Sequence, residues 1–207
     1  FLGERGIRLC LARPELLRQQ VRAILRAAEA GPVRIMFPMI ADIGEWRRAR
    51  QIVEEARAEL GSPPVEMGIM IEIPSAALMA DRFAAEVDFF SVGTNDLTQY
   101  TLAMDRMHPT LAAHSDGLHP AVLRLIARTV EAAHEQGKWV GICGELGADP
   151  AAVPILVGLG VDELSVSVPA VAGVKAQIRD LKLDAAQRLA QRALACATAG
   201  EVRALAG

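Results

Sequence analysis

Apolar residues follow two alternating patterns along the chain, and these predict strands and helices in turn. Short runs rich in Val, Ile, Phe and Met predict buried strands at about 33–37, 67–71, 88–92, 138–142 and 163–166. Between them, apolar positions recur at helical spacing over about 14–30, 43–60, 75–84, 120–136, 149–159, 169–178 and 184–197. This alternation is typical of βαβ units, which form a parallel sheet with right-handed crossovers.

Proline and short polar residues mark the expected starts of several helices. Proline is tolerated in the first turn of a helix, where a missing N–H costs nothing. We therefore expect Pro14, Pro120 and Pro169 each to begin a helix. Ser75 and Asp149 are expected to cap helices with their side-chain oxygens.

The number of predicted strands limits the fold class. About five strands are visible in 207 residues, whereas a complete (β/α)8 TIM barrel typically needs about 250 residues. We therefore predict an α/β fold in the form of a truncated TIM barrel, with about five parallel strands and their helices. Residues 1–207 are expected to form one domain, or part of one.

Composition supports a packed core and excludes several classes of function. The chain is 52% hydrophobic and 23% charged, and its net charge of -3 provides no basic stripe for nucleic acid. Three cysteines are too few for a disulfide framework and fit a reducing cytosol, so we expect a cytoplasmic protein. No apolar run reaches the roughly 18 residues of a membrane span, so no membrane insertion is expected. An anionic ligand would therefore have to be held by local arginines and a metal.

The stretch from Val87 to Tyr100 places polar residues directly after a buried strand. Gly93 breaks the apolar run, and Asn95 and Asp96 follow it. In parallel α/β folds functional sites lie at this end of the strands, where an amide and a carboxylate suit a hard cation and an anionic ligand. Asn and Asp are also common in turns and helix caps, so both interpretations stay open on this stretch alone.

Glu72 closes an otherwise apolar strand that precedes this stretch. A lone buried carboxylate is costly unless it is paired or binds a metal. Asp96 is expected at the same end of the sheet, and two carboxylates from adjacent strands can share one Mg²⁺. The alternative is that Glu72 is a structural residue held in a salt bridge.

Five motifs resemble, in order, those of the phosphoenolpyruvate (PEP)-utilising enzymes, and their form is nearest to Enzyme I of the bacterial sugar phosphotransferase system. They are Phe1–Arg8, Ile35–Ile40, Gly68–Pro74, Gly93–Leu102 with Asp105–Arg106, and Gly141–Leu146. Together they extend over nearly the whole chain. The resemblance implies that residues 1–207 are the C-terminal part of a PEP-binding TIM-barrel domain, with the last five strands. The first strands, the phospho-His domain and the phosphocarrier-binding domain would then lie outside this chain, which begins at Phe1 without an initiator Met.

The resemblance also assigns roles to residues of the predicted site. It implies that Glu72 and Asp96 ligate Mg²⁺. It places Asn95 and Asp96 at the phosphate of PEP. Arg106 matches a PEP-binding arginine, and Arg5 matches a neighbouring arginine of the same site. A guanidinium is well suited to this task because it meets phosphate or carboxylate in bidentate fashion.

Cys143 ends the strand at 138–142 and precedes a glycine-rich turn. A lone Cys in an apolar strand is more often an inert part of the core. The resemblance instead makes Cys143 the catalytic acid that protonates the enol carbon of PEP as pyruvate forms. Glu145, two residues further on, would support it.

Three histidines in the long loop after Arg106 have a simpler interpretation. The spacing of His108, His114 and His119 matches no metal-binding pattern, so we expect surface residues. In the family, Gly-Asn usually follows Asp-Arg, whereas this chain has Met107-His108. This departure concerns the rim of the site and leaves its central residues unchanged.

The activity that the resemblance implies is transfer of the PEP phosphoryl group to a His on a separate domain, releasing pyruvate, as the first step of sugar uptake. The partners would be PEP, that phospho-His domain, the histidine-containing phosphocarrier protein and a second copy of the chain in a homodimer. Without the acceptor His, residues 1–207 alone are expected to be inactive. The alternatives are the C-terminal domain of pyruvate phosphate dikinase or PEP synthase, and a non-catalytic binding or dimerisation module.

Overall fold

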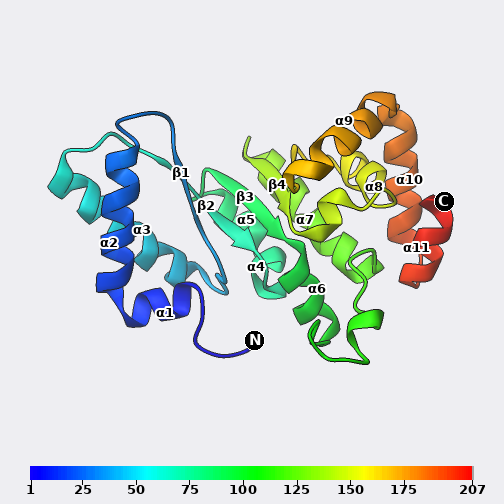
Figure 1. Ribbon diagram of the computed structural model, residues 1–207, viewed down its shortest axis with the longest axis horizontal. Coiled ribbons are helices and arrows are strands. Elements are labelled where there is room, and N and C mark those ends of the chain that lie inside the picture. The colour runs from blue at the N-terminus through cyan, green and yellow to red at the C-terminus, as the bar shows by residue number, and fades with distance from the viewer. Residues whose placement is uncertain (207) are drawn as a thin grey trace.

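A five-stranded parallel sheet forms the centre of the computed structural model, which describes residues 1–206 (Figure 1). The strands pair in sequence order, as the alternating pattern predicts. Their bounds are β1 Arg34–Phe37, β2 Glu66–Ile71, β3 Phe89–Gly93, β4 Trp139–Cys143 and β5 Glu163–Leu164. The predicted α/β class and the five strands of a partial barrel are therefore confirmed.

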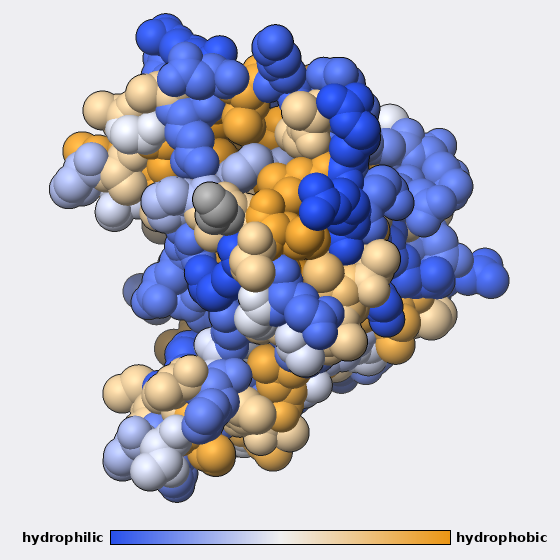
Figure 2. Space-filling model, turned by 90° about the vertical axis from the view of Figure 1, so that its right-hand side faces the viewer, coloured by the Kyte–Doolittle hydropathy of each residue, from blue (hydrophilic) through white to orange (hydrophobic). Residues whose placement is uncertain are grey.

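Helices connect the strands and cover the sheet. They are α1 Ile7–Ala12, α2 Pro14–Ala27, α3 Ile43–Leu60, α4 Pro74–Leu78, α5 Ala80–Ala84, α6 Thr94–Leu102, α7 Pro120–Glu135, α8 Val153–Gly158, α9 Val171–Asp180, α10 Leu183–Ala195 and α11 Ala199–Ala206, with short 3-10 turns at Ala112–His114, Glu145–Ala148 and Val168–Ala170. Figure 1 shows α1 to α3 beyond the β1 side of the sheet and α8 to α11 beyond the other side. Figure 2 shows the side of the molecule on which α8 to α11 lie, and this surface is mostly hydrophilic with separate apolar patches. Within residues 1–206 no helix combines the length and apolarity needed to cross a membrane.

The predicted helix starts at Pro14 and Pro120 are confirmed, whereas the predicted caps at Ser75 and Asp149 are wrong. Pro14 begins α2 as expected. Ser75 does not cap a helix, because α4 begins at Pro74 and the Ser75 hydroxyl donates to the carbonyl of Ala41 at 2.9 Å. Asp149 accepts a hydrogen bond from the Ala151 amide at 2.9 Å and so forms a turn, and α8 begins only at Val153.

The remaining differences concern short helices. The helix expected over 75–84 is divided at Met79 into α4 and α5. Pro169 lies in the 3-10 turn before α9. Pro120 begins α7 as predicted, and His119 caps that helix by accepting from the Ala121 amide at 3.1 Å through Nδ1. The sequence pattern was too short to predict α1 and α6.

Successive side chains of each strand point to opposite faces of the sheet, and the two faces differ in composition. The face against the helices carries buried apolar side chains, which are Ile35, Phe37, Ile69, Ile71, Phe90, Val92, Val140 and Ile142. On the opposite face, Trp139 stacks on Phe89 with ring centroids 4.6 Å apart. The guanidinium of Arg34, which is paired with Glu66, covers Trp139 at 5.2 Å. Large side chains therefore fill this face at the amino-terminal ends of the strands, and only its other end is free for a site.

Candidate functional site

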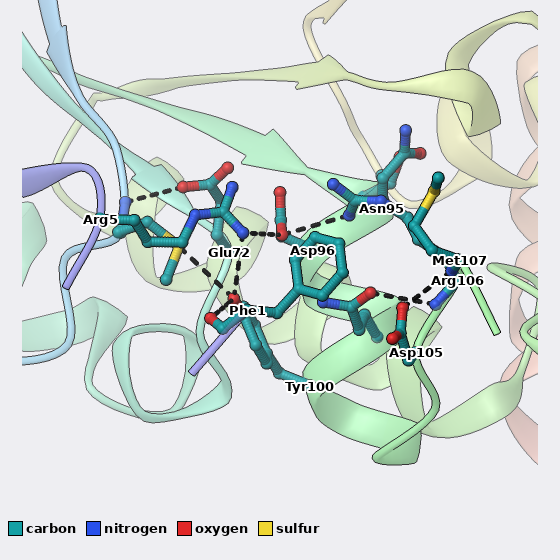
Figure 3. Close-up of polar contacts among 12 residues, drawn as sticks. Phe1, Arg5, Glu72, Asn95, Asp96, Tyr100, Asp105, Arg106 and Met107 are labelled. Carbon is teal, nitrogen blue, oxygen red and sulfur yellow. Dashed lines mark hydrogen bonds and ion pairs between the residues drawn. The ribbon is translucent and has the colours of Figure 1, made fainter. Parts of the chain in front are cut away.

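The predicted site residues all come to the carboxyl ends of the strands. Glu72 directly follows β2, Cys143 is the last residue of β4, and Asn95 and Asp96 lie in the first turn of α6 directly after β3. Because the strands are parallel, their carboxyl ends meet at one edge of the sheet. Arg5 reaches the same edge from the loop before α1, and Arg106 does so from the loop after α6 (Figure 3).

Asp96 lies between two guanidinium groups (Figure 3). Its Oδ1 is 3.3 Å from Nη1 of Arg5 and 3.2 Å from Nη1 of Arg106. The Asp96 carboxylate is buried, while both arginines keep part of their side chains in solvent. The two guanidinium groups also lie over the Phe1 ring, at 5.4 and 5.1 Å from its centroid. Asp96 thus holds two guanidinium groups next to each other at the carboxyl edge of the sheet.

Glu72 is held by the loop that follows β1. The Met39 amide donates to Oε2 of Glu72 at 2.7 Å, and only 5% of Glu72 is exposed. Met39 has a φ of 61°, which is unusual for a residue with a side chain and is typical of strained segments at functional sites. Burial raises the pKa of Glu72 and the charge of Asp96 adds to this, whereas the Met39 amide and both arginines act in the opposite direction. Because the charges of Asp96, Arg5 and Arg106 all act on the pKa of Glu72, these four side chains share one electrostatic environment.

Gly93 makes room for the Glu72 side chain. A Cβ at position 93 would lie 2.6 Å from Cγ and 2.9 Å from Oε1 of Glu72. The backbone at Gly93 has a φ of -81°, so the requirement for glycine is one of space and not of conformation. Sequence reasoning treated Gly93 only as the end of an apolar run and missed this close approach.

Gly144, which directly follows β4, packs against the first turn of α6, where Asn95 lies. Its φ is 113°, and a Cβ there would lie 2.5 Å from Oγ1 of Thr94. This close passage lets the Glu145 amide donate to Oδ1 of Asn95 at 3.2 Å, which fixes the Asn95 side chain. The amide nitrogen of Asn95 then remains to donate to a ligand. Glu145, which was expected to support Cys143, makes this contact with its backbone.

Cys143 ends β4 with its thiol among polar neighbours. The Ser91 hydroxyl donates to Sγ at 3.2 Å, and Sγ in turn donates to the carbonyl of Val92 at 3.5 Å. Burial is the main reason that the pKa of Cys143 is raised, and the charge of Glu72 acts in the same direction. The thiol is therefore protonated at neutral pH.

A cavity of about 770 Å³ opens beside Asn95 and Arg106. Its far wall is formed by Arg203 of α11, which pairs with Asp116 at 2.6 and 2.9 Å and with Asp149 at 3.1 Å. Burial raises the pKa of Asp116, but the hydrogen bonds from Arg203 and the Leu118 amide outweigh it and leave that pKa below its ordinary value. No local sequence pattern predicts this contact, because Arg203 and Asp116 are 87 positions apart in the sequence.

The histidines of the rim lie outside this arrangement. His108 and His114 are exposed, as expected for surface residues. His119 is half-buried because it caps α7, so its role is structural.

The two carboxylates fit a magnesium ion, though not a metal with a full protein cage. Residues 1–206 contain no group of three or more His, Cys, Asp or Glu side chains arranged to hold a metal. Mg²⁺ is nevertheless commonly held by only one or two carboxylates together with water and ligand phosphate, and Glu72 and Asp96 supply two such oxygen ligands. With both carboxylates ionised, their charges cancel those of Arg5 and Arg106. A highly anionic ligand therefore needs an additional cation at this site.

The fold and the site together define a parallel α/β domain of the barrel type, with two arginines and two carboxylates gathered at the carboxyl edge of its sheet. A family profile described as PEP-utilising enzyme, PEP-binding domain, matches residues 1–183. The chain therefore belongs to the PEP-utilising enzyme family.

Relatives are found over almost the whole chain. A multiphosphoryl transfer protein from Rhodobacter capsulatus is 63% identical over 205 residues, covering 99% of this chain and 25% of that protein. A phosphoenolpyruvate-protein phosphotransferase from Staphylococcus carnosus is 49% identical over 208 residues, covering 98% of this chain and 36% of that protein. The chain thus spans between a quarter and about a third of these relatives.

The fold is similar to that of solved structures. One example, a citrate lyase from Burkholderia xenovorans LB400, aligns with a TM-score of 0.62 and 25% identity, over 86% of this chain and 58% of the lyase. This likeness supports the α/β barrel architecture.

Proposed function

We propose that this domain binds PEP together with Mg²⁺ and forms the PEP half of a phosphotransferase. The observation that carries this proposal is the meeting of Arg5 and Arg106 on Asp96, beside Glu72, at the carboxyl edge of the sheet. Two arginines provide bidentate donors for phosphate and carboxylate. Family membership supports PEP as the anion.

Each residue has a separate task in this proposal. Arg106 and Arg5 bind the anionic groups of PEP, and the free amide nitrogen of Asn95 donates to the phosphate. Glu72 and Asp96 would hold Mg²⁺ through their carboxylate oxygens. When bound, the metal supplies charge that neutralises the phosphate, which is the main requirement of phosphoryl transfer. The Met39 amide keeps Glu72 oriented toward the site.

Cys143 is the proposed proton donor. As the phosphoryl group leaves, the enol carbon needs a proton to become the methyl group of pyruvate. The S–H bond of Cys143 breaks, a C–H bond forms at that carbon, and a thiolate remains. The raised pKa of Cys143 supports this role, because the donor must be protonated before the reaction.

The phosphoryl acceptor in this proposal is a His on another domain of a longer protein. The names of the relatives support this, since both are phosphoryl transfer proteins that extend beyond the matched region. We further propose that a histidine-containing phosphocarrier protein receives the group in sugar uptake, that the protein is cytoplasmic, and that it acts as a homodimer. A dikinase or PEP synthase is the second candidate, and the names of these relatives favour it less. A non-catalytic module is disfavoured by the complete set of site residues.

Calorimetric titration with PEP, in MgCl2 and in EDTA, tests the proposal on this chain and on the longer protein. Binding is expected in magnesium only. Arg106→Lys should weaken it about tenfold or more, because hydrogen bonds to charged groups contribute roughly 1.5–3 kcal/mol. The matched control is Arg188→Lys, whose arginine pairs with Asp184 on the exposed face of α10. Equal affinity in EDTA would contradict the metal role, and absence of binding to the longer protein would refute the proposal.

A further inference from the structure

A buried serine hydroxyl contacts the thiol of Cys143. Ser91 lies in β3 on the same face of the sheet as Cys143 and is only 9% exposed. Ser91 is opposite Gly141, and Gly93 is opposite Cys143, so the serine and the cysteine are diagonal neighbours on adjacent strands. Gly141 has no side chain to come between them. The Ser91 Oγ thus reaches Sγ at 3.2 Å.

The direction of the hydrogen bonds around Sγ is informative. The sulfur accepts from Ser91 and donates its own proton to the carbonyl of Val92. Once the thiol has given up its proton, the contact to Val92 is lost and the contact from Ser91 becomes a hydrogen bond to an anion. Hydrogen bonds to the charged form of a group favour that form and are stronger than neutral ones.

We propose that Ser91 is a positioning residue for proton transfer, whose hydroxyl orients the Cys143 sulfur and stabilises the thiolate formed as pyruvate is made. The inference rests on the proposed function of Cys143. Ser91 keeps its own proton throughout, and water from the solvent returns a proton to the sulfur before the next cycle. The structure places no other side-chain donor on Sγ within residues 1–206.

Ser91 could have a merely structural role, as a hydrogen-bond partner for a buried thiol, or it could stabilise the thiolate. The two roles differ in what a substitution of Ser91 changes. Both would affect stability when Ser91 is changed. Only the second affects the pH at which Cys143 becomes reactive and the rate of the protonation step. These two quantities therefore form the test.

The first measurement is the pH dependence of iodoacetamide alkylation at Cys143, followed by mass spectrometry of its peptide so that Cys10 and Cys196 do not interfere. Ser91→Ala should raise the apparent pKa of Cys143 by about one unit, the effect of losing one hydrogen bond to a charged atom. Ser91→Thr keeps the hydroxyl and should titrate as the unchanged protein does. Thr129→Ala is the control, because it removes another buried hydroxyl, which donates to Leu125 within α7.

The second measurement is pyruvate formation by the longer protein. Ser91→Ala should lower kcat about tenfold with little change in the KM for PEP, since the lost contact acts on the transition state. An unchanged alkylation pKa, or an unchanged kcat, would overturn the role of Ser91. Unchanged protein that makes no pyruvate would instead refute the proposed function, and the Ser91 proposal with it.

Discussion

Replacing Gly93 by Ala should disturb the candidate site while leaving the sheet in place. The added Cβ would lie 2.6 Å from Cγ of Glu72, whereas carbon atoms in contact are normally about 3.5–4.0 Å apart. The Glu72 side chain must therefore move by about 1 Å. Overpacking of this kind costs roughly 1–3 kcal/mol of stability. Ala itself is compatible with the backbone, because φ at position 93 is -81°.

The same displacement should weaken ligand binding more than it weakens the fold. Glu72 would lose its alignment with the Met39 amide, and a misplacement of about 1 Å in an active site can lower activity by about a hundredfold. We expect the urea midpoint of Gly93→Ala to fall with an unchanged m-value, and magnesium-dependent PEP affinity in the longer protein to fall at least tenfold. Glu72→Asp in the Gly93→Ala background shortens the clashing side chain and should restore stability without restoring affinity.

The control for this experiment is a glycine with free space around it. A Cβ at Gly173 in α9 would meet no atom within 4 Å, and Gly173→Ala should stabilise the protein by about 0.5–1 kcal/mol. Gly93→Ala with the stability and PEP affinity of the unchanged protein would show that Glu72 is not held in the position described above.

The proton donor, the rim and the oligomeric state can each be tested by one further experiment. Cys143→Ala in the longer protein should abolish pyruvate formation and leave PEP binding nearly intact in calorimetry; normal turnover would refute its role as the acid. Arg203→Gln should cost about 1 kcal/mol at neutral pH and less below about pH 4. The lowered pKa of Asp116 means that this ion pair stabilises the fold above the unfolded value of 3.8 and is lost as pH falls through the folded value; an equal cost at both pH values would refute the pairing. Light scattering of the isolated chain should detect association, because β1 is an edge strand; a monomer at tens of micromolar with cooperative melting would contradict this.

Strands β1 to β4 could be predicted from sequence because each is a short, mainly apolar run bounded by Gly, Pro or a polar residue. Strand β5 is limited to Glu163–Leu164 and is not buried, so the strand expected over 163–166 is shorter than predicted. Arg5, Arg106 and Cys143 were assigned by the family resemblance alone. Glu72 and Asp96, in contrast, could be singled out from the pattern of apolar runs, since both come directly after such runs. In parallel sheets that position alone brings residues together, whatever their distance in the sequence. Helix α6 was harder to predict, because Asn95 and Asp96 are as typical of turns as of a first helical turn.

Other features of the site depend on close approaches that no local pattern encodes. Gly93 is needed because of the Glu72 side chain and Gly144 because of Thr94, and both glycines resemble ordinary breaks between elements. Arg203 reaches the rim only because α11, which comes 87 positions after Asp116 in the sequence, packs near it in the fold. From the sequence, Ser91 is one polar residue in a buried strand. Its contact with Cys143 depends on the register between β3 and β4, which local sequence does not encode.

The face of the sheet that carries Phe89 and Trp139 explains why the candidate site lies at one end of the strands. Residues two apart on a strand share this face, so β3 and β4 each present a series of side chains from bottom to top. At the bottom the stacked rings of Phe89 and Trp139 fill the space. At the top Gly93 contributes no side chain, and the Glu72 side chain takes the volume that it leaves, while Cys143 lies opposite Gly93 on β4. The large rings of Phe89 and Trp139 pack this face at the amino-terminal ends of the strands. At the carboxyl ends Gly93 has no side chain, so a ligand could reach Glu72 and Cys143 there. A larger residue at position 93 should therefore impair the site, and a smaller one at position 139 should impair only the fold.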